Sequence, residues 1–169
     1  MVQAIGIAAL CLMTLHCGYR LRGTGSYLPS HIKKIGIPMF KNDTTRYELD
    51  LRLTQAVISE MVARAKVEVV AEYSGVDAVL TGEILSFSVN PIAFTGQATA
   101  DKYNITIVVR ILLRDLVNKK TLFANPSFVY VKEYDVPEGT DFESVETEAI
   151  SKVAEEFART IVVSLLEGF

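Results

Sequence analysis

Cys17 is one of two cysteines in this sequence, and it stands in a distinctive setting. It stands at the end of an apolar run, in the stretch LHCGYRLRG, and glycine, tyrosine and two arginines follow it. Three roles are open to its thiol: a small buried side chain, one half of a disulfide, or the point at which the chain is cut and joined to a lipid. The only other cysteine, Cys11, lies within the apolar run, so removal of that run leaves no intramolecular disulfide partner.

The segment before Cys17 has the character of a secretory signal. Its apolar stretch is too short to span a bilayer but has the length of a signal-peptide hydrophobic region. Two features depart from the usual pattern, because no Lys or Arg precedes the run and the bulky His16 occupies the position before the cut. We expect a lipoprotein signal peptide over residues 1–16 and a lipidated tether over residues 17–30, with a buried N-terminal helix or strand as the alternative.

Basic side chains gather in three short clusters, which are Arg20 with Arg22, Lys33 with Lys34, and Lys119 with Lys120. The last pair falls on a predicted turn, and Arg114 precedes it by a few residues. Solvated turn residues are the simplest interpretation of any one pair. The functional alternative is contact with an anionic ligand such as a phosphorylated lipid head group, because Lys and Arg donate charge-assisted hydrogen bonds to phosphate. Arg114, Lys119 and Lys120 are the predicted contacts to such a ligand.

The sequence offers little for catalysis or metal binding. After Cys17 the only histidine is His31, so the several nitrogen or sulfur ligands of a metal site are absent from the pattern. Neither a Gly-x-Ser-x-Gly elbow nor a phosphate loop is present. Adjacent carboxylates such as Glu155 and Glu156 fall on the predicted solvent face of a helix. We expect no catalytic residues, no metal and no cofactor, and a hydrolase whose site escapes motif analysis is a remote alternative.

Composition points to one folded domain. The chain has 169 residues, of which 50% are hydrophobic and 22% are charged, enough to build a single core. The formal net charge of −3 gives no reason to expect nucleic acid as a partner. After the N-terminal segment, no second long apolar run predicts a membrane span.

Hydrophobic periodicity predicts the strands that must position these residues. We expect strands at residues 32–39, 66–73, 76–91, 102–116 and 121–136. A one-residue change of apolar phase predicts a β-bulge near Ile84 and Leu85. The last strand is expected to be interrupted at Asn125 and Pro126.

Two helices are expected, one over residues 41–65 and the other over residues 140–169, each with an apolar stripe at helical spacing. Thr45 and Glu48 are arranged as a Thr-x-x-Glu capping box for the first helix. Both stripes need a sheet to pack against. We therefore expect an α+β two-layer sandwich over residues 31–169, in which two helices pack on one face of a mixed four-stranded sheet.

Several stretches together resemble the LptE family of lipopolysaccharide-assembly lipoproteins. They are CGYRLRG at Cys17, IPMFKNDTTRYELD at the first strand-to-helix junction, DAVLTGEI in a later strand, and YNITIVVRILLRDLVNKKTLF. The likeness covers nearly the whole chain after Cys17. Its more specific parts are the Cys-Gly-Tyr start, the junction and the DAVLTGEI strand, whereas the rest is a general α+β pattern.

The resemblance implies an outer-membrane lipoprotein that faces the periplasm, with the lipid on Cys17 and without enzymatic activity. It also implies a place inside the lumen of the large β-barrel LptD, help in that barrel's assembly, and binding of lipopolysaccharide during its insertion into the outer leaflet. The family's basic residues have no matching motif here, so Arg114, Lys119 and Lys120 are assigned to lipopolysaccharide by local chemistry. The alternative is a periplasmic adaptor or ligand-binding lipoprotein that acts without a barrel partner.

Overall fold

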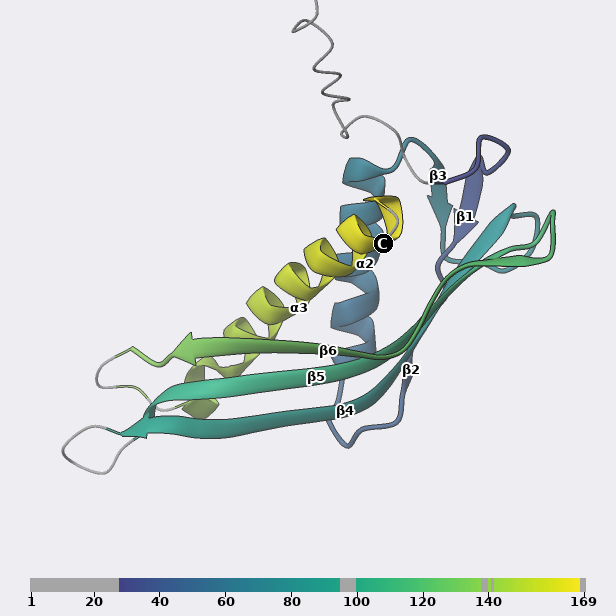
Figure 1. Cartoon of the computed structure of the whole chain (residues 1–169). Helices are drawn as coiled ribbons and strands as arrows, with labels where there is room; N and C mark the ends of the chain where they lie inside the picture. Colours follow the sequence, from purple (N-terminus) through teal and green to yellow (C-terminus); the bar gives the residue numbers. More distant parts are fainter. Residues whose placement is uncertain (1–27, 95–99, 138–139, 141, 168–169) are drawn as a thin grey trace, which may run out of the picture.

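The computed structural model describes residues 28–94, 100–137, 140 and 142–167 (Figure 1). The elements, in chain order, are β1 (Lys34–Gly36), β2 (Lys41–Asn42), α2 (Leu49–Arg64), β3 (Glu68–Val70), β4 (Ala78–Phe94), β5 (Ala100–Asp115), β6 (Lys120–Asp135) and α3 (Phe142–Glu167). The expected α+β class with two helices and a mixed sheet is confirmed for this part of the chain.

The sheet has six strands in the order β3-β1-β4-β5-β6, and β2 also pairs with β4. The three long strands β4, β5 and β6 form an antiparallel meander, whereas β1 pairs parallel with both β3 and β4. The predicted four-stranded sheet is therefore wrong, because all five expected strand segments join one sheet and a further strand, β2, forms within the range expected for the first helix. The expected strand over residues 32–39 ends early at Gly36. Pro38 lacks a backbone N–H to donate, so pairing resumes only at β2, farther along the same edge of β4.

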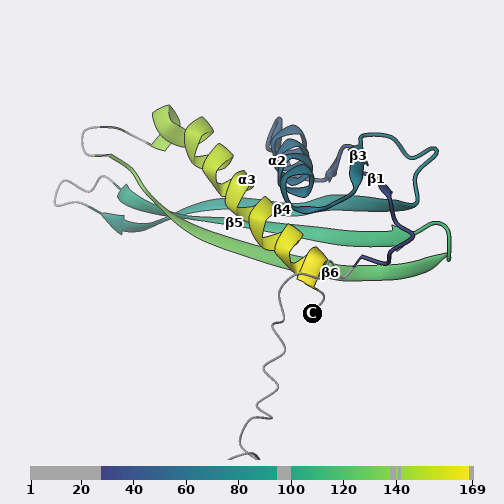
Figure 2. The same cartoon turned by 90° about the horizontal axis from the view of Figure 1, so that it is seen from above.

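Both helices lie against the same side of the sheet (Figure 2). The side chains of β5 alternate as expected, so that Ile105, Ile107, Val109, Ile111 and Leu113 are buried. They share one core with the buried stripe of α2, which includes Leu49, Leu53, Val57 and Met61, and with that of α3, which includes Val153, Phe157, Ile161 and Leu165. The helical and strand periodicities of the sequence thus meet in a single hydrophobic core.

Two irregularities of the long strands lie where the sequence predicts them. The pairing of β4 with β5 shifts register between Ile84 and Ser86, which confirms the expected bulge. The pairing of β5 with β6 shifts opposite Asn125 and Pro126, where the Asn125 side chain accepts a hydrogen bond from the backbone N–H of Ser127 at 3.0 Å. Each bulge lets a long strand keep its apolar side chains on the helix-covered face after the phase changes.

The predicted capping box of the first helix is wrong. The helix α2 begins at Leu49, and Glu48 is itself the N-cap residue, with φ 58° and no side-chain capping bond. The turn before the helix is organised instead by Asn42, whose side-chain oxygen accepts hydrogen bonds from the N–H and hydroxyl groups of Thr44. Asn and Asp compete for such local backbone bonds, and here that competition wins over the capping box.

Candidate functional site

Arg114, Lys119 and Lys120 come together at one end of the sheet, around the β5–β6 turn. Arg114 lies near the end of β5, Lys119 has a positive φ of 55° within the turn, and Lys120 begins β6. All three side chains are exposed, and none forms an ion pair with a carboxylate of the described residues. Within the described part of the chain, the three cations therefore lie around one turn without a carboxylate partner.

The pairing register places Arg114 and Lys120 on opposite faces of the sheet. Lys120 is paired with Asp115, and Arg114 is paired with Thr121 of β6 and Val79 of β4. Directly paired residues of antiparallel strands share a face, whereas neighbours along a strand point to opposite faces. Since the buried Asp115 shares the helix-covered face, Lys120 lies on that side and Arg114 on the open side, with Lys119 in the turn between them.

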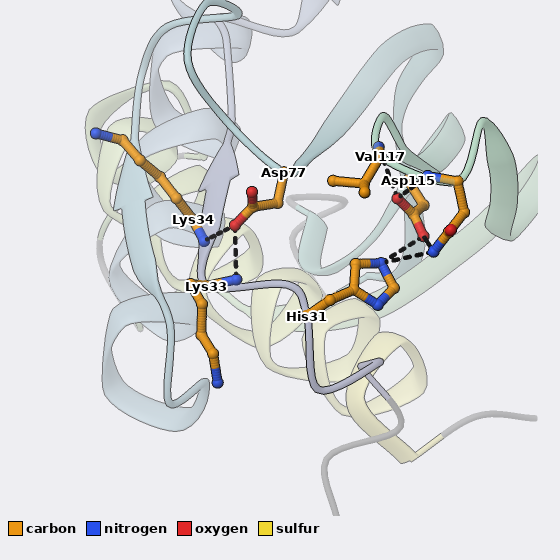
Figure 3. A network of polar contacts seen from close by, with 7 residues as sticks. His31, Lys33, Lys34, Asp77, Asp115 and Val117 are labelled. Carbon is orange, nitrogen blue, oxygen red and sulfur yellow. Dashed lines mark hydrogen bonds and ion pairs between the residues drawn. The ribbon is translucent and has the colours of Figure 1, made fainter.

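Asp115 is the residue that shapes this turn (Figure 3). Only 1% of it is exposed. One carboxylate oxygen accepts the backbone N–H groups of Val117 and Asn118, both at 2.9 Å. The other lies 3.0 Å from the Asn118 side-chain nitrogen and 2.7 Å from His31 Nε2. An aspartate that bonds to the N–H groups two and three residues ahead is a local turn signal. The stretch DLVN at residues 115–118 therefore indicates a turn that begins at Asp115.

These contacts determine the charge of Asp115. Burial by itself raises the pKa of the carboxyl, because it penalises the ionised form. The backbone and side-chain hydrogen bonds from Asn118 and the contact with His31 act in the opposite direction and hold the pKa at about 2. Asp115 is therefore an anion at neutral pH, placed beneath the exposed lysines of the turn.

Asp77, just before β4, is a second carboxylate that joins segments at this end. Its side chain accepts the backbone N–H groups of Lys33 and Lys34 at 2.8 and 2.9 Å (Figure 3). Its own backbone N–H donates to Lys34, and its carbonyl oxygen accepts the N–H of Leu116. The bonds from Lys33 and Lys34 hold the pKa of Asp77 below its ordinary value. Asp77 thus holds the backbone of Lys33 and Lys34 in place. The Lys34 ammonium pairs separately with Glu68 at 2.9 Å.

The arrangement is suited to binding anions. The cations lie around the β5–β6 turn, whereas a hollow of about 420 Å³ lies elsewhere and is lined by residues of α2 and α3 that include Arg52 and Arg159. Among the described residues, no group of three or more His, Cys, Asp or Glu side chains is placed to hold a metal ion. Exposed ammonium and guanidinium groups on a rigid support can pair with phosphate oxygens. The predicted residues Cys17, Arg20 and Arg22 lie outside the described residues.

No helix in the described part of the chain combines the length and the apolar character needed to cross a bilayer.

The structure is similar in fold to several solved proteins, of which three are described. The first is the rare lipoprotein B from Shewanella oneidensis, with a TM-score of 0.53 and 16% identity over 79% of this chain and 93% of that one. The second is a hypothetical protein from Chlamydia trachomatis, with a TM-score of 0.57 and 10% identity over 82% and 97%. The third is a putative lipoprotein from Caulobacter crescentus, with a TM-score of 0.50 and 13% identity over 75% and 87%.

Sequence comparison assigns the family. None of the curated protein sequences compared with the chain is significantly similar to it. The model of the lipopolysaccharide-assembly family LptE, in contrast, matches residues 32–165, which include every helix and strand from β1 to β6 and nearly all of α3. The match covers more than half of the chain. The chain therefore belongs to the LptE family of lipopolysaccharide-assembly proteins.

Proposed function

We propose that this protein is a non-enzymatic lipoprotein of the outer membrane, facing the periplasm, that assists the insertion of lipopolysaccharide into the outer leaflet. The observation that carries the proposal is the family match over residues 32–165, which contain every described core residue except Leu28. Cys17, directly after an apolar segment, supplies a position for the lipid. Several acyl chains on one cysteine anchor a protein far more firmly than a single chain does.

The proposed partner is the large β-barrel LptD, with this chain as a plug in the barrel lumen and a factor in its assembly. A plug needs a rigid body, and the single core shared by the sheet and both helices provides one. Enclosure in a lumen also protects the unpaired edge of β6, a strand of 16 residues at the end of the sheet order. Exposed edges of that length otherwise invite pairing with other chains.

The proposed lipopolysaccharide contacts are Arg114, Lys119 and Lys120. Their charged groups are unpaired within the described residues, so phosphate does not have to displace an existing carboxylate partner. The hydrogen bonds of Asp115 hold the turn in one conformation, which lowers the entropy lost when a ligand binds. Phosphate groups of the lipopolysaccharide are the part of that ligand that this chemistry recognises.

Co-purification tests the proposed function. The full chain with a C-terminal tag is extracted from outer membranes in mild detergent, and a single large β-barrel protein is expected to accompany it. Depletion of the chain is expected to reduce the lipopolysaccharide exposed at the cell surface. Recovery of the protein alone, with an intact outer-membrane barrier after depletion, contradicts the proposal and favours an adaptor lipoprotein that acts without a barrel.

A further inference from the structure

The first described segment, residues 28–33, is fastened to the same end of the sheet as the β5–β6 turn. Leu28 and Ile32 are buried in the core, at 9% and 2% exposure. The N–H of Ile32 donates to the carbonyl oxygen of Pro29 at 2.9 Å, which gives the segment a tight turn. His31 lies between these buried residues in the sequence, and its side chain points across to Asp115 (Figure 3).

His31 is the side chain that ties this segment to the buried carboxylate. The other three donors to Asp115 come from Val117 and Asn118, in the aspartate's own turn. The contact of His31 Nε2 with Asp115 spans 84 residues of sequence and measures 2.7 Å. The His31 side chain is 35% exposed, whereas that of Asp115 is 2% exposed. Solvent therefore reaches the imidazole, whereas the carboxylate that it touches is almost fully buried.

The charged groups that face His31 include two carboxylates. Asp115 lies at the end of β5, and Asp77, before β4, is close enough for His31 to lower its pKa. Asn118 of the turn adds an uncharged amide 3.0 Å from His31 Nε2. The cations of this end, Lys33, Lys34, Lys119 and Lys120, are lysines, a residue type that does not ordinarily titrate between about pH 5 and pH 8. Histidine is therefore the type of residue whose charge changes in this range.

We infer that His31 and Asp115 form a proton-sensitive clamp, which holds residues 28–33 on the end of the sheet more tightly when the imidazole is protonated. A neutral imidazole donates one hydrogen bond to the carboxylate, whereas an imidazolium adds the attraction of two opposite charges at the same contact. This inference does not rest on the proposed function. The clamp connects residues 28–33 to the turn that carries Lys119, because Asp115 bonds to both of them.

Hydrogen exchange of backbone amides measures the clamp directly. The amides of Ile32, Lys33 and Lys34 donate to Pro29 and Asp77, so their exchange requires opening of the clamped segment. Protection factors of the folded chain, corrected for intrinsic exchange, are compared at about pH 5.5 and about pH 8, on either side of the usual histidine range. We expect protection about five-fold higher at the lower pH, because charge-assisted hydrogen bonds are roughly twice as strong as neutral ones.

Two variants separate the clamp from a general effect of pH. In His31→Gln the side chain still donates a hydrogen bond but does not titrate, so the pH dependence of these three amides is expected to disappear. In Asp115→Asn the carboxylate charge is lost, and the dependence should disappear as well. Amides in the middle of α2, near Val57, serve as the internal control and should keep equal protection at both pH values. Equal protection of residues 32–34 at both pH values in the unmodified protein, or a pH dependence that survives in His31→Gln, overturns the inference.

Discussion

Lys119 and Lys120 are visible in the sequence as a basic pair, but the residue that places them is the buried Asp115. Its two oxygens bond to the backbone of the turn and to His31, so the turn has one preferred shape. The exposed ammonium groups contribute little to folding, because solvated charges at a surface are screened by water and salt. Removal of the lysine charges is therefore expected to affect ligand binding while the fold stays intact.

Reversal of the turn charges tests the proposed ligand contacts. Lys119→Glu together with Lys120→Glu should weaken lipopolysaccharide binding by roughly ten-fold, the equivalent of about 1.4 kcal/mol, as expected for the loss of charge-assisted bonds. Lys152→Glu with Arg159→Glu changes the net charge equally but on α3, and it should leave binding close to that of the unmodified protein. The affinities of both double variants for surface-immobilised lipopolysaccharide are measured and compared with that of the unmodified protein. Equal losses in both double variants would assign the effect to overall charge.

Acid sensitivity is the expected signature of Asp115. Its folded pKa of about 2 lies below the ordinary 3.8, so the ionised carboxylate stabilises the fold above about pH 4. That contribution is lost as the pH falls toward 2. Asp115→Asn should therefore be less stable than the unmodified protein in urea at neutral pH, and the difference should shrink below about pH 3. A difference in unfolding free energy that stays constant across this range contradicts the role given to the charge.

The helix α3 depends on aromatic contacts with β6. The ring of Phe157 meets those of Phe128 and Tyr130 edge to face, at centroid distances of 5.7 and 6.1 Å. Beside it, Glu156 accepts the Tyr130 hydroxyl at 2.9 Å and pairs with Lys132 at 2.8 Å. Burial and this bond to Glu156 raise the pKa of Tyr130 to about 12. Apolar packing in the core and a polar seam at its rim together fix α3 on the sheet.

Truncation of Phe157 should therefore be costly. The side chain is fully buried, and Phe157→Ala is expected to lower the free energy of unfolding by about 3–5 kcal/mol, through lost burial and the cavity left behind. Val62 of α2, at 61% exposure, offers the matched control, since Val62→Ala should change stability by less than about 0.5 kcal/mol. Urea unfolding followed by circular dichroism gives both values. A loss below about 1 kcal/mol for Phe157→Ala would contradict a tightly packed helix–sheet contact.

For the molecule as a whole, the cationic turn and the start of the described chain lie at the same end of the sheet. The contact of His31 with Asp115 brings residues 28–33 to the β5–β6 turn, whereas Phe94 of β4 and Ala100 of β5 pair at the opposite end of these strands. The proposed lipopolysaccharide contacts and the first described segment therefore lie at one end of a rigid body.

Lipidation of Cys17 is testable by mass spectrometry of the mature protein. The N-terminal peptide from membranes is expected to begin at Cys17 and to carry the added mass of acyl chains. Each buried methylene contributes about 0.8 kcal/mol to membrane binding, so several chains make the attachment stable. Cys17→Ala should yield no acylated peptide and should shift the protein toward the soluble fraction. An unmodified N-terminus at another residue would contradict the proposed signal peptide over residues 1–16.

Local patterns of the sequence were sufficient for the types of the main elements and for their buried faces. The strict alternation from Ile105 to Leu113 predicts one core face of β5, and the phase change near Ile84 predicts the bulge, because side-chain period follows backbone geometry directly. The same holds for the apolar stripes of α2 and α3. The family resemblance also came from local stretches, and the match over residues 32–165 confirms it.

Other features depended on the tertiary structure. The parallel pairing of β1 with β3 and β4, the split between β1 and β2, and the N-cap at Glu48 all depart from what the patterns predict. The role of Asp77 and the contact of Asp115 with His31 were equally hidden, since both join groups more than 40 residues apart. Periodicity records which side of an element is buried but carries no information about which distant segment lies against it. Strand order and the contacts of a buried carboxylate are set by long-range packing, and only the folded chain brings those partners together.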